Sequence, residues 1–145
     1  MKIIVDADAC PVKDEIESFA KANSMEVIMV IDTSHILTSD YSKIIVVDKG
    51  KDNVDMVVIN NTCKGDIVVT QDFGVACLAL GKGAHAINQN GLIFTDKNMD
   101  KFLFERHLSK QARKMGKKTT HVKKRTKIDD KKFEKSLQLL SKHIK

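Results

Sequence analysis

The sequence predicts one α/β domain of three layers with a mostly parallel sheet at its centre. Short apolar runs alternate along the chain with stretches of helical periodicity, which is the order typical of α/β folds. The runs are apolar at consecutive positions, as in strands that helices cover on both faces. The 145 residues suit a single domain, 1–145, whose core needs neither metal nor disulfide.

The expected strands are short and rich in valine and isoleucine. They lie at residues 3–5, 27–31, 44–47, 67–69 and, more weakly, 84–87. After the turn residues Asn90 and Gly91, the run 92–94 predicts a short hairpin strand at the edge of the sheet. We therefore expect about five main strands and an edge hairpin.

Helical periodicity marks the segments between most of these strands. Three helices are expected, at residues 12–20, 54–64 and 73–80. Pro11 stands at the start of the first, where its missing N–H costs nothing. The third is apolar nearly all round, so we expect it to be buried, Cys77 included. The link 32–43 between the second and third strands shows no clear helix.

The last third of the chain is also mostly helical. From about residue 98 to 115, two apolar faces lie nearly opposite each other, one with Phe102 and the other with Phe104. Such a helix should be covered on both sides or bend near residue 103. Residues 116–128 have no usable period and predict a loop, and 133–144 predict a final amphipathic helix.

Charge divides the chain into two parts. Residues 1–100 hold 9 Lys and Arg against 15 Asp and Glu, which gives −6, and residues 101–145 hold 16 against 4, which gives +12. We expect 98–145 to be a basic helical extension packed on the domain. An acidic body with a basic extension suggests a polyanionic partner such as nucleic acid, and a solvated lysine-rich surface is the alternative.

The cysteines and the start of the chain bear on the compartment. Cys10, Cys63 and Cys77 are an odd number without CxxC spacing, which argues against a disulfide framework or a structural zinc site. The first residues lack a signal-peptide pattern, and no apolar run is long enough to cross a membrane. We expect a cytoplasmic protein with no membrane partner, and the sequence does not indicate its oligomeric state.

Carboxylates follow the predicted strands. Asp6 and Asp8 stand where the first strand ends, Asp72 follows the fourth, and Asp55 lies in the first turn of the second helix. Ligands of open α/β sheets bind beyond the carboxyl ends of the strands. Converging carboxylates repel unless a cation intervenes, and Mg²⁺ and Mn²⁺ prefer such oxygen sites. Helix capping is the alternative for all but Asp6, which ends a buried strand where an unpaired carboxylate is costly.

Three other side chains at this edge could take part in chemistry. Cys10 lies beside a helix N-terminus, which can activate a thiol, but the sequence places no His or Asn partner. Ser34 and His35 follow the second strand at the same edge. They are either a substrate contact or an ordinary turn residue beside a surface histidine.

The basic extension has one dense segment. Its candidate nucleic-acid-binding residues are Arg113, Lys114, Lys117, Lys118, Lys123, Lys124, Arg125 and Lys127. No acid and no aromatic residue interrupts them, so no base-stacking platform is expected from this segment. The predicted contacts are therefore with phosphates and independent of base sequence.

Four motifs together resemble the YaiI/YqxD family of bacterial proteins over almost the whole chain. They are DADACPV (6–12), GDIVVTQDFGVA (65–76), NGLIFT (90–95) and FLFERHLSKQARKMG (102–116). Members are considered PIN-like, so the resemblance implies a parallel sheet in the order 3-2-1-4-5 and a carboxylate cluster that binds Mg²⁺ or Mn²⁺. Carried over, the acidic positions are Asp6, Asp8, Asp55 and Asp72. The segment 116–122 departs from the family pattern because His121-Val122 replaces a Gly-Pro turn.

These observations predict a metal-dependent phosphodiester hydrolase acting on RNA or another nucleic acid. Asp6 and Asp72 would bind Mg²⁺ or Mn²⁺ directly, and Asp8 and Asp55 would bind through water or orient the attacking water. One alternative is a phosphatase of the haloacid dehalogenase type, with Asp6 as covalent nucleophile, although no later paired-acid motif is found. The other is a nucleic-acid-binding protein that does not cleave.

Overall fold

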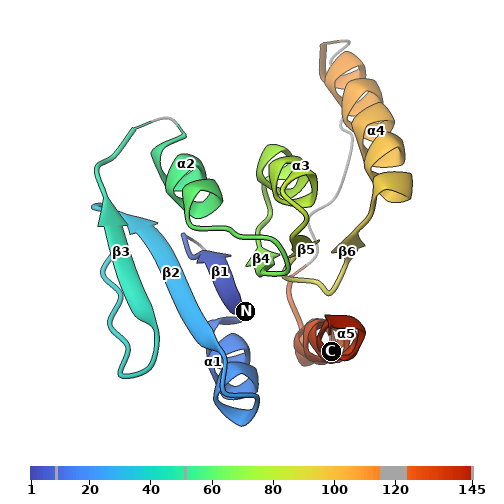
Figure 1. Cartoon of the computed structure of the whole chain (residues 1–145). Coiled ribbons are helices and arrows are strands. Elements are labelled where there is room, and N and C mark those ends of the chain that lie inside the picture. Colours follow the sequence, from blue (N-terminus) through green and yellow to red (C-terminus); the bar gives the residue numbers. More distant parts are fainter. Residues whose placement is uncertain (9, 51, 115–123, 145) are drawn as a thin grey trace.

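The computed structural model describes residues 1–8, 10–50, 52–114 and 124–144 and shows a sheet between two layers of helices (Figure 1). The strands are β1 (Lys2–Asp6), β2 (Glu26–Asp32), β3 (Lys43–Val47), β4 (Ile67–Val69), β5 (His85–Ile87) and β6 (Ile93–Phe94). The helices are α1 (Lys13–Ala22), α2 (Asn53–Asn60), α3 (Phe73–Gly81), α4 (Asp96–Lys114) and α5 (Lys127–Ile144).

The sheet has the order β3-β2-β1-β4-β5-β6. The first five strands are parallel, and β6 pairs antiparallel with β5. The predicted α/β class and the order 3-2-1-4-5 are confirmed, and the expected edge hairpin supplies a sixth strand. Because β1 is central, the carboxyl ends of β2 and β4 lie on either side of Asp6.

Both faces of the sheet are buried, which explains why its strands are apolar at consecutive positions. On one face, Ile3 and Val5 pack with α1 and with Phe133 of α5, all of them fully buried. On the other face, Ile4 and Val68 pack with α2 and α3. Figure 1 shows the same division, with α1 and α5 below the sheet and α2 and α3 above it.

Helix α4 departs from its predicted environment. It is one uninterrupted helix, and Phe102 packs edge-to-face against Phe73 and Phe94, with ring centroids 6.3 and 6.2 Å apart. Phe104 and Leu108, on the other face, are 63% and 49% exposed. The expectation that both faces are covered, or that the helix bends, is therefore wrong. Figure 1 shows why, because α4 projects from the body beyond its first turns.

Two local expectations are also corrected. Helix α2 ends at Asn60 rather than before Gly65, because the side chains of Asn61 and Thr62 donate to the carbonyls of Val57 and Val58. Cys77, expected to be buried, is exposed, and so is Cys63, which the sequence likewise predicts to be a small buried residue. No helix in the described ranges is long and apolar enough to cross a membrane.

Candidate functional site

The carboxyl ends of β1 and β4 bring Asp6 beside Thr70. These strands are parallel neighbours, and the Thr70 hydroxyl donates to a carboxylate oxygen of Asp6 at 3.3 Å. Burial and the charges of Asp55, Asp8 and Asp72 raise the pKa of Asp6 to about 6, against the opposing effect of the Thr70 hydrogen bond. Asp8, Asp55 and Asp72 thus lie close enough to Asp6 to raise its pKa.

Asp72 is held in place by the start of α3. One of its carboxylate oxygens accepts a hydrogen bond from the Val75 backbone N–H at 3.0 Å, and its own N–H donates to the Thr70 hydroxyl. The capping role proposed as the alternative is therefore real for Asp72, and it leaves the second carboxylate oxygen for other contacts. Capping fixes the direction of this side chain at the sheet edge.

Asp55 lies in the first turn of α2 but is not its N-cap residue, a position that Asp52 occupies. Its side chain is half-buried. Burial, followed by the charges of Asp72 and Asp52, raises the pKa of Asp55. The mutual repulsion at this edge therefore reaches from β1 to α2.

The four aspartates line adjoining hollows rather than one cavity. Asp6 and Asp8 line a small pocket of about 30 Å³, together with Thr70 and Gln71. Asp55 and Asp72 line a groove of about 450 Å³ between α2 and α3. In the described ranges, no three ligating atoms that include Asp6, Asp55 or Asp72 lie within 4.8 Å of one another. A cation shared by Asp6 and Asp72 therefore stays a prediction.

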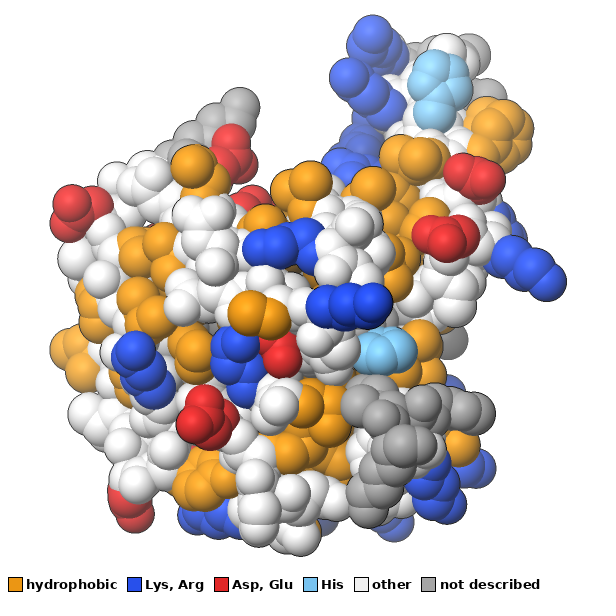
Figure 2. All heavy atoms as spheres, viewed as in Figure 1, with side chains coloured by type: hydrophobic (Ala, Val, Ile, Leu, Met, Phe, Trp, Pro, Cys, Tyr) orange, Lys and Arg blue, Asp and Glu red, His pale blue; other side chains and the backbone are white. Residues whose placement is uncertain are grey.

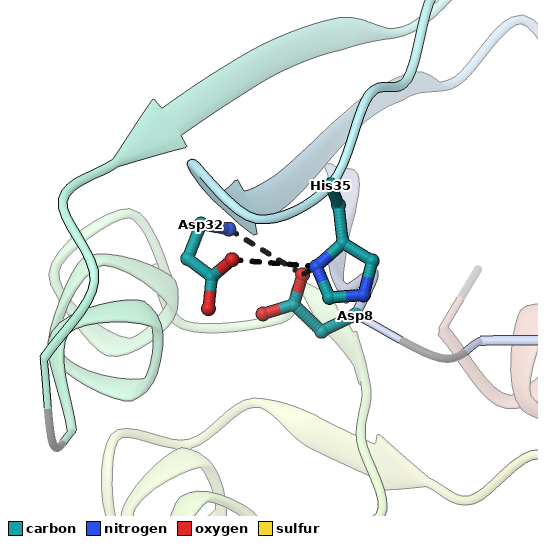
Figure 3. A group of neighbouring side chains, drawn as sticks. All are labelled: Asp8, Asp32 and His35. Carbon is teal, nitrogen blue, oxygen red and sulfur yellow. Dashed lines mark hydrogen bonds and ion pairs between the residues drawn. The ribbon is translucent and has the colours of Figure 1, made fainter.

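Asp8 lies beside the last residue of β2, Asp32, and beside His35 in the turn that follows. Figure 3 shows Asp8, Asp32 and His35 pointing toward one another. The His35 Nδ1 lies 2.9 Å from an Asp8 oxygen and 3.3 Å from an Asp32 oxygen, and the Asp32 N–H donates to Asp8 at 3.4 Å. His35 is exposed, as a surface histidine would be, and it also pairs with Asp8, while a substrate contact of His35 stays a prediction. Asp8 caps no helix, since α1 begins only at Lys13.

Asp32 is a site residue that the predicted set lacked, although the sequence contains a signal for it. Asp32 ends a buried strand just as Asp6 does, and β2 is a neighbour of β1. Hydrogen bonds from Ser34, and then His35, lower the pKa of Asp32. Two carboxylates and an imidazole at this spacing suit Mn²⁺, and without a cation the imidazole Nδ1–H donates to the carboxylates.

Cys10 lies in the same small pocket as Asp6 and Asp8. Burial raises the pKa of its thiol, and this effect exceeds the opposing hydrogen bond from Val12. A raised pKa keeps the thiol protonated and weakly nucleophilic at neutral pH. The catalytic-thiol alternative is therefore disfavoured.

The predicted basic residues divide into three groups. Arg113 and Lys114 are the last residues of α4. Lys124 lies just before α5 and Lys127 at its start, and both are exposed. Three others, Lys117, Lys118 and Lys123, lie outside the described residues. Figure 2 shows Lys and Arg side chains gathered on the projecting end of α4, while basic and acidic side chains are both scattered over the rest of this face.

Arg125 has a structural position instead. Its guanidinium donates to the Asp130 carboxylate, the Asn90 side chain and the Gln89 carbonyl, each at 2.7 Å. These bonds tie the start of α5 to the turn between β5 and β6. Since three protein acceptors engage its donors, we do not count Arg125 among the residues that contact a ligand.

Comparison with known proteins agrees with the motifs. The family model described as "Uncharacterized BCR, YaiI/YqxD family" matches residues 4–143. A protein of Ruminiclostridium cellulolyticum named UPF0178 protein is 56% identical over 142 residues, which cover 98% of this chain and 93% of the relative. Another UPF0178 protein, from Lachnoclostridium phytofermentans, is 57% identical over 147 residues that cover 99% of each chain.

A UPF0178 protein from Natranaerobius thermophilus is 46% identical over 138 residues, which cover 95% of this chain and 94% of the relative. No solved structure matches significantly. The names of the relatives describe no activity, so they bear on family and not on reaction. This chain belongs to the YaiI/YqxD family.

Proposed function

We propose that the protein is a divalent-metal-dependent phosphodiester hydrolase that acts on nucleic acid, with RNA as the expected substrate. One observation carries the proposal: the ends of β1 and β4 and the start of α2 bring Asp6, Asp72 and Asp55 to one edge of the sheet, where burial, and then the charges of Asp55, Asp8 and Asp72, raise the pKa of Asp6 to about 6. In the described part of the chain, no Lys or Arg nitrogen lies within 4.0 Å of these three carboxylates. A cation is the partner that such a set lacks.

The donor set suits Mg²⁺ or Mn²⁺, because every ligand at this edge except His35 offers oxygen. Bound there, the ion would lower the pKa of a water and neutralise charge at phosphorus. Asp6 and Asp72 would hold it, and Asp72 is already oriented by its cap bond to Val75. Asp8, positioned by His35, would hold the ion or orient the attacking water, and Asp55 would act through water. The PIN-like relationship implied by the motifs supports the same assignment.

The test is a cleavage assay with purified protein on single-stranded and structured RNA, in Mg²⁺, Mn²⁺ and EDTA. We expect products in metal and none in EDTA. Binding without product in any metal would contradict hydrolysis and favour a protein that only binds nucleic acid.

The hydrogen bond from Thr70 to Asp6 is the observation that supports the phosphatase alternative, because that chemistry needs a hydroxyl beside a nucleophilic aspartate. Release of phosphate from a monoester, with a phosphoryl group trapped on Asp6, would favour the phosphatase over the hydrolase.

A further inference from the structure

We propose that the groove between the start of α3 and the inner face of α4 binds single-stranded nucleic acid, with a base against its phenylalanines and phosphates at its arginines. The inference rests on the proposed function, since it takes the bound strand to be the substrate. It goes further by naming an unpaired strand as the substrate class and by placing the contacts on described residues away from the carboxylate pocket.

The groove has the size and the composition of a ligand site. Its volume is about 480 Å³, within the range of about 300–1,000 Å³ that is common for small-ligand pockets. Its walls are Gln71, Asp72 and Phe73 on one side and Phe102, Glu105, Arg106, Ser109 and Arg113 on the other. The α4 residues stand at positions i, i+3, i+4, i+7 and i+11, so they form a single stripe along the helix.

Phenylalanines supply the apolar wall. Phe73, Phe94 and Phe102 meet edge to face with centroids 6.2 to 6.4 Å apart, an arrangement that holds the rings in place. Phe73 and Phe102 are only half-buried, so part of each ring faces the groove. The basic segment itself contains no aromatic residue, but the fold brings Phe73 from α3 beside the arginines of α4.

Arginines supply the phosphate contacts. The Arg106 guanidinium lies over the Phe73 ring, 5.6 Å from its centroid, and the Arg113 side chain lies one turn further along the wall beyond Ser109. Within the described ranges, no carboxylate lies within 4.0 Å of either guanidinium. Both charges therefore point to an anion that is not part of this chain.

The combination favours an unpaired strand over other polyanions. The lining holds two arginines and two acids, Asp72 and Glu105, so its positive charge lies locally at Arg106 and Arg113. Arginines beside an aromatic wall bind single strands because every base has a π-face, whereas bases in a duplex are already stacked. Asp72 lines both this groove and the α2–α3 groove of the carboxylate edge. A strand gripped by Arg106 and Arg113 would thus run toward the proposed metal ligands.

Two matched pairs of variants on α4 test the inference in the full-length protein. Phe102→Ala is compared with Phe104→Ala, and Arg106→Gln with Lys101→Gln. Residues 102 and 104 are about 200° apart around the helix, so Phe104 lies on the far face. The probe is a fluorescein-labelled 12-nucleotide single-stranded RNA, measured by anisotropy in EDTA so that no cleavage occurs.

We expect Phe102→Ala to weaken binding roughly 5- to 100-fold, the range for loss of a stacking platform. Arg106→Gln should weaken binding and lower the log–log salt slope by roughly 0.7, and its exposed side chain makes misfolding no concern. Phe104→Ala and Lys101→Gln should bind like wild type. Equal losses within each pair, or no loss at Arg106, would overturn the groove assignment.

Competitors separate the ligand classes. If a duplex RNA or polyglutamate displaces the probe as well as unlabelled single-stranded RNA does, the site is merely polyanionic and the inference fails. A parallel cleavage assay in Mn²⁺ distinguishes the two proposals. If wild type binds through the groove but does not cleave, the proposed hydrolase activity is wrong and the proposed binding site stands. If Phe102→Ala and Arg106→Gln affect neither cleavage nor binding, the proposed binding site is wrong and the proposed hydrolase activity stands.

Discussion

The carboxylate edge and helix α4 face each other across Asp72, and they are held in place in different ways. Asp6 stands at the end of a central strand, flanked by β2 and β4, with its neighbours fixed by strand register. Helix α4 is positioned mainly at its start, where Phe102 meets Phe73 and Phe94, and its far end projects. The position of the acidic residue Asp6 is therefore fixed by the sheet, whereas the basic helix α4 is held by an aromatic contact near its start, the aromatic anchor.

The largest expected effect concerns the carboxylate edge. Asp6→Asn or Asp72→Asn should lower metal-dependent cleavage of RNA by at least about 100-fold, since even outer partners of metal ligands contribute about 10- to 100-fold. Asp14→Asn, an exposed acid in the first turn of α1, is the matched control and should cleave like wild type. Normal rates in both site variants would remove these residues from the chemistry.

The aromatic anchor can be tested through stability. Phe102→Ala should lower the free energy of unfolding by about 1–3 kcal/mol, less than for a fully buried phenylalanine. Phe104→Ala, on the exposed face, should stay within about 0.5 kcal/mol of wild type. Urea denaturation of both variants measures the difference. Equal effects would mean that α4 is anchored elsewhere.

The raised pKa of Asp6 predicts how stability without metal varies with pH. Between its ordinary value of 3.8 and about 6, the unfolded chain releases this proton while the folded protein retains it. The free energy of unfolding of wild type, measured relative to that of Asp6→Asn, should therefore be highest below pH 4. It should decrease as the pH rises through 6, by about 1–3 kcal/mol in all.

Unfolding of wild type and Asp6→Asn in EDTA at pH 4, 5, 6 and 7 measures this change. A constant difference across these pH values would show that Asp6 titrates normally. Added Mn²⁺ should then raise the melting temperature of wild type and not that of the variant, because the ion binds only the folded site.

The smallest effects concern the basic residues beyond α4. Lys124→Ala and Lys127→Ala should each lower the log–log salt slope of RNA binding by roughly 0.7 and leave stability unchanged. Arg125→Ala should do the reverse, with an unchanged slope and a loss of about 1.5–3 kcal/mol, because its bonds to Asp130, Asn90 and Gln89 are structural. A salt slope that falls with Arg125→Ala would return this residue to the interface.

Much of the architecture could be predicted, because it follows from local patterns. Apolar runs with a β-branched composition located β1 to β4, a weaker apolar run located β5, and the turn residues Asn90 and Gly91 located β6. Helical periodicity located the helices between them. Strand order came from the family resemblance rather than from periodicity. Asp6, Asp8, Asp55 and Asp72 were singled out because the carboxyl ends of parallel strands meet at one edge.

By itself, the sequence determined the α/β class, the strand and helix positions and the presence of acidic residues at strand ends, since each depends on the spacing of nearby residues. Only the tertiary structure decided that His35 joins Asp8, that Arg125 bonds to Asn90 and Gln89, and that Phe73 lies beside Arg106. Those contacts join segments distant in sequence, so they depend on which strands are neighbours and on where α4 leaves the body.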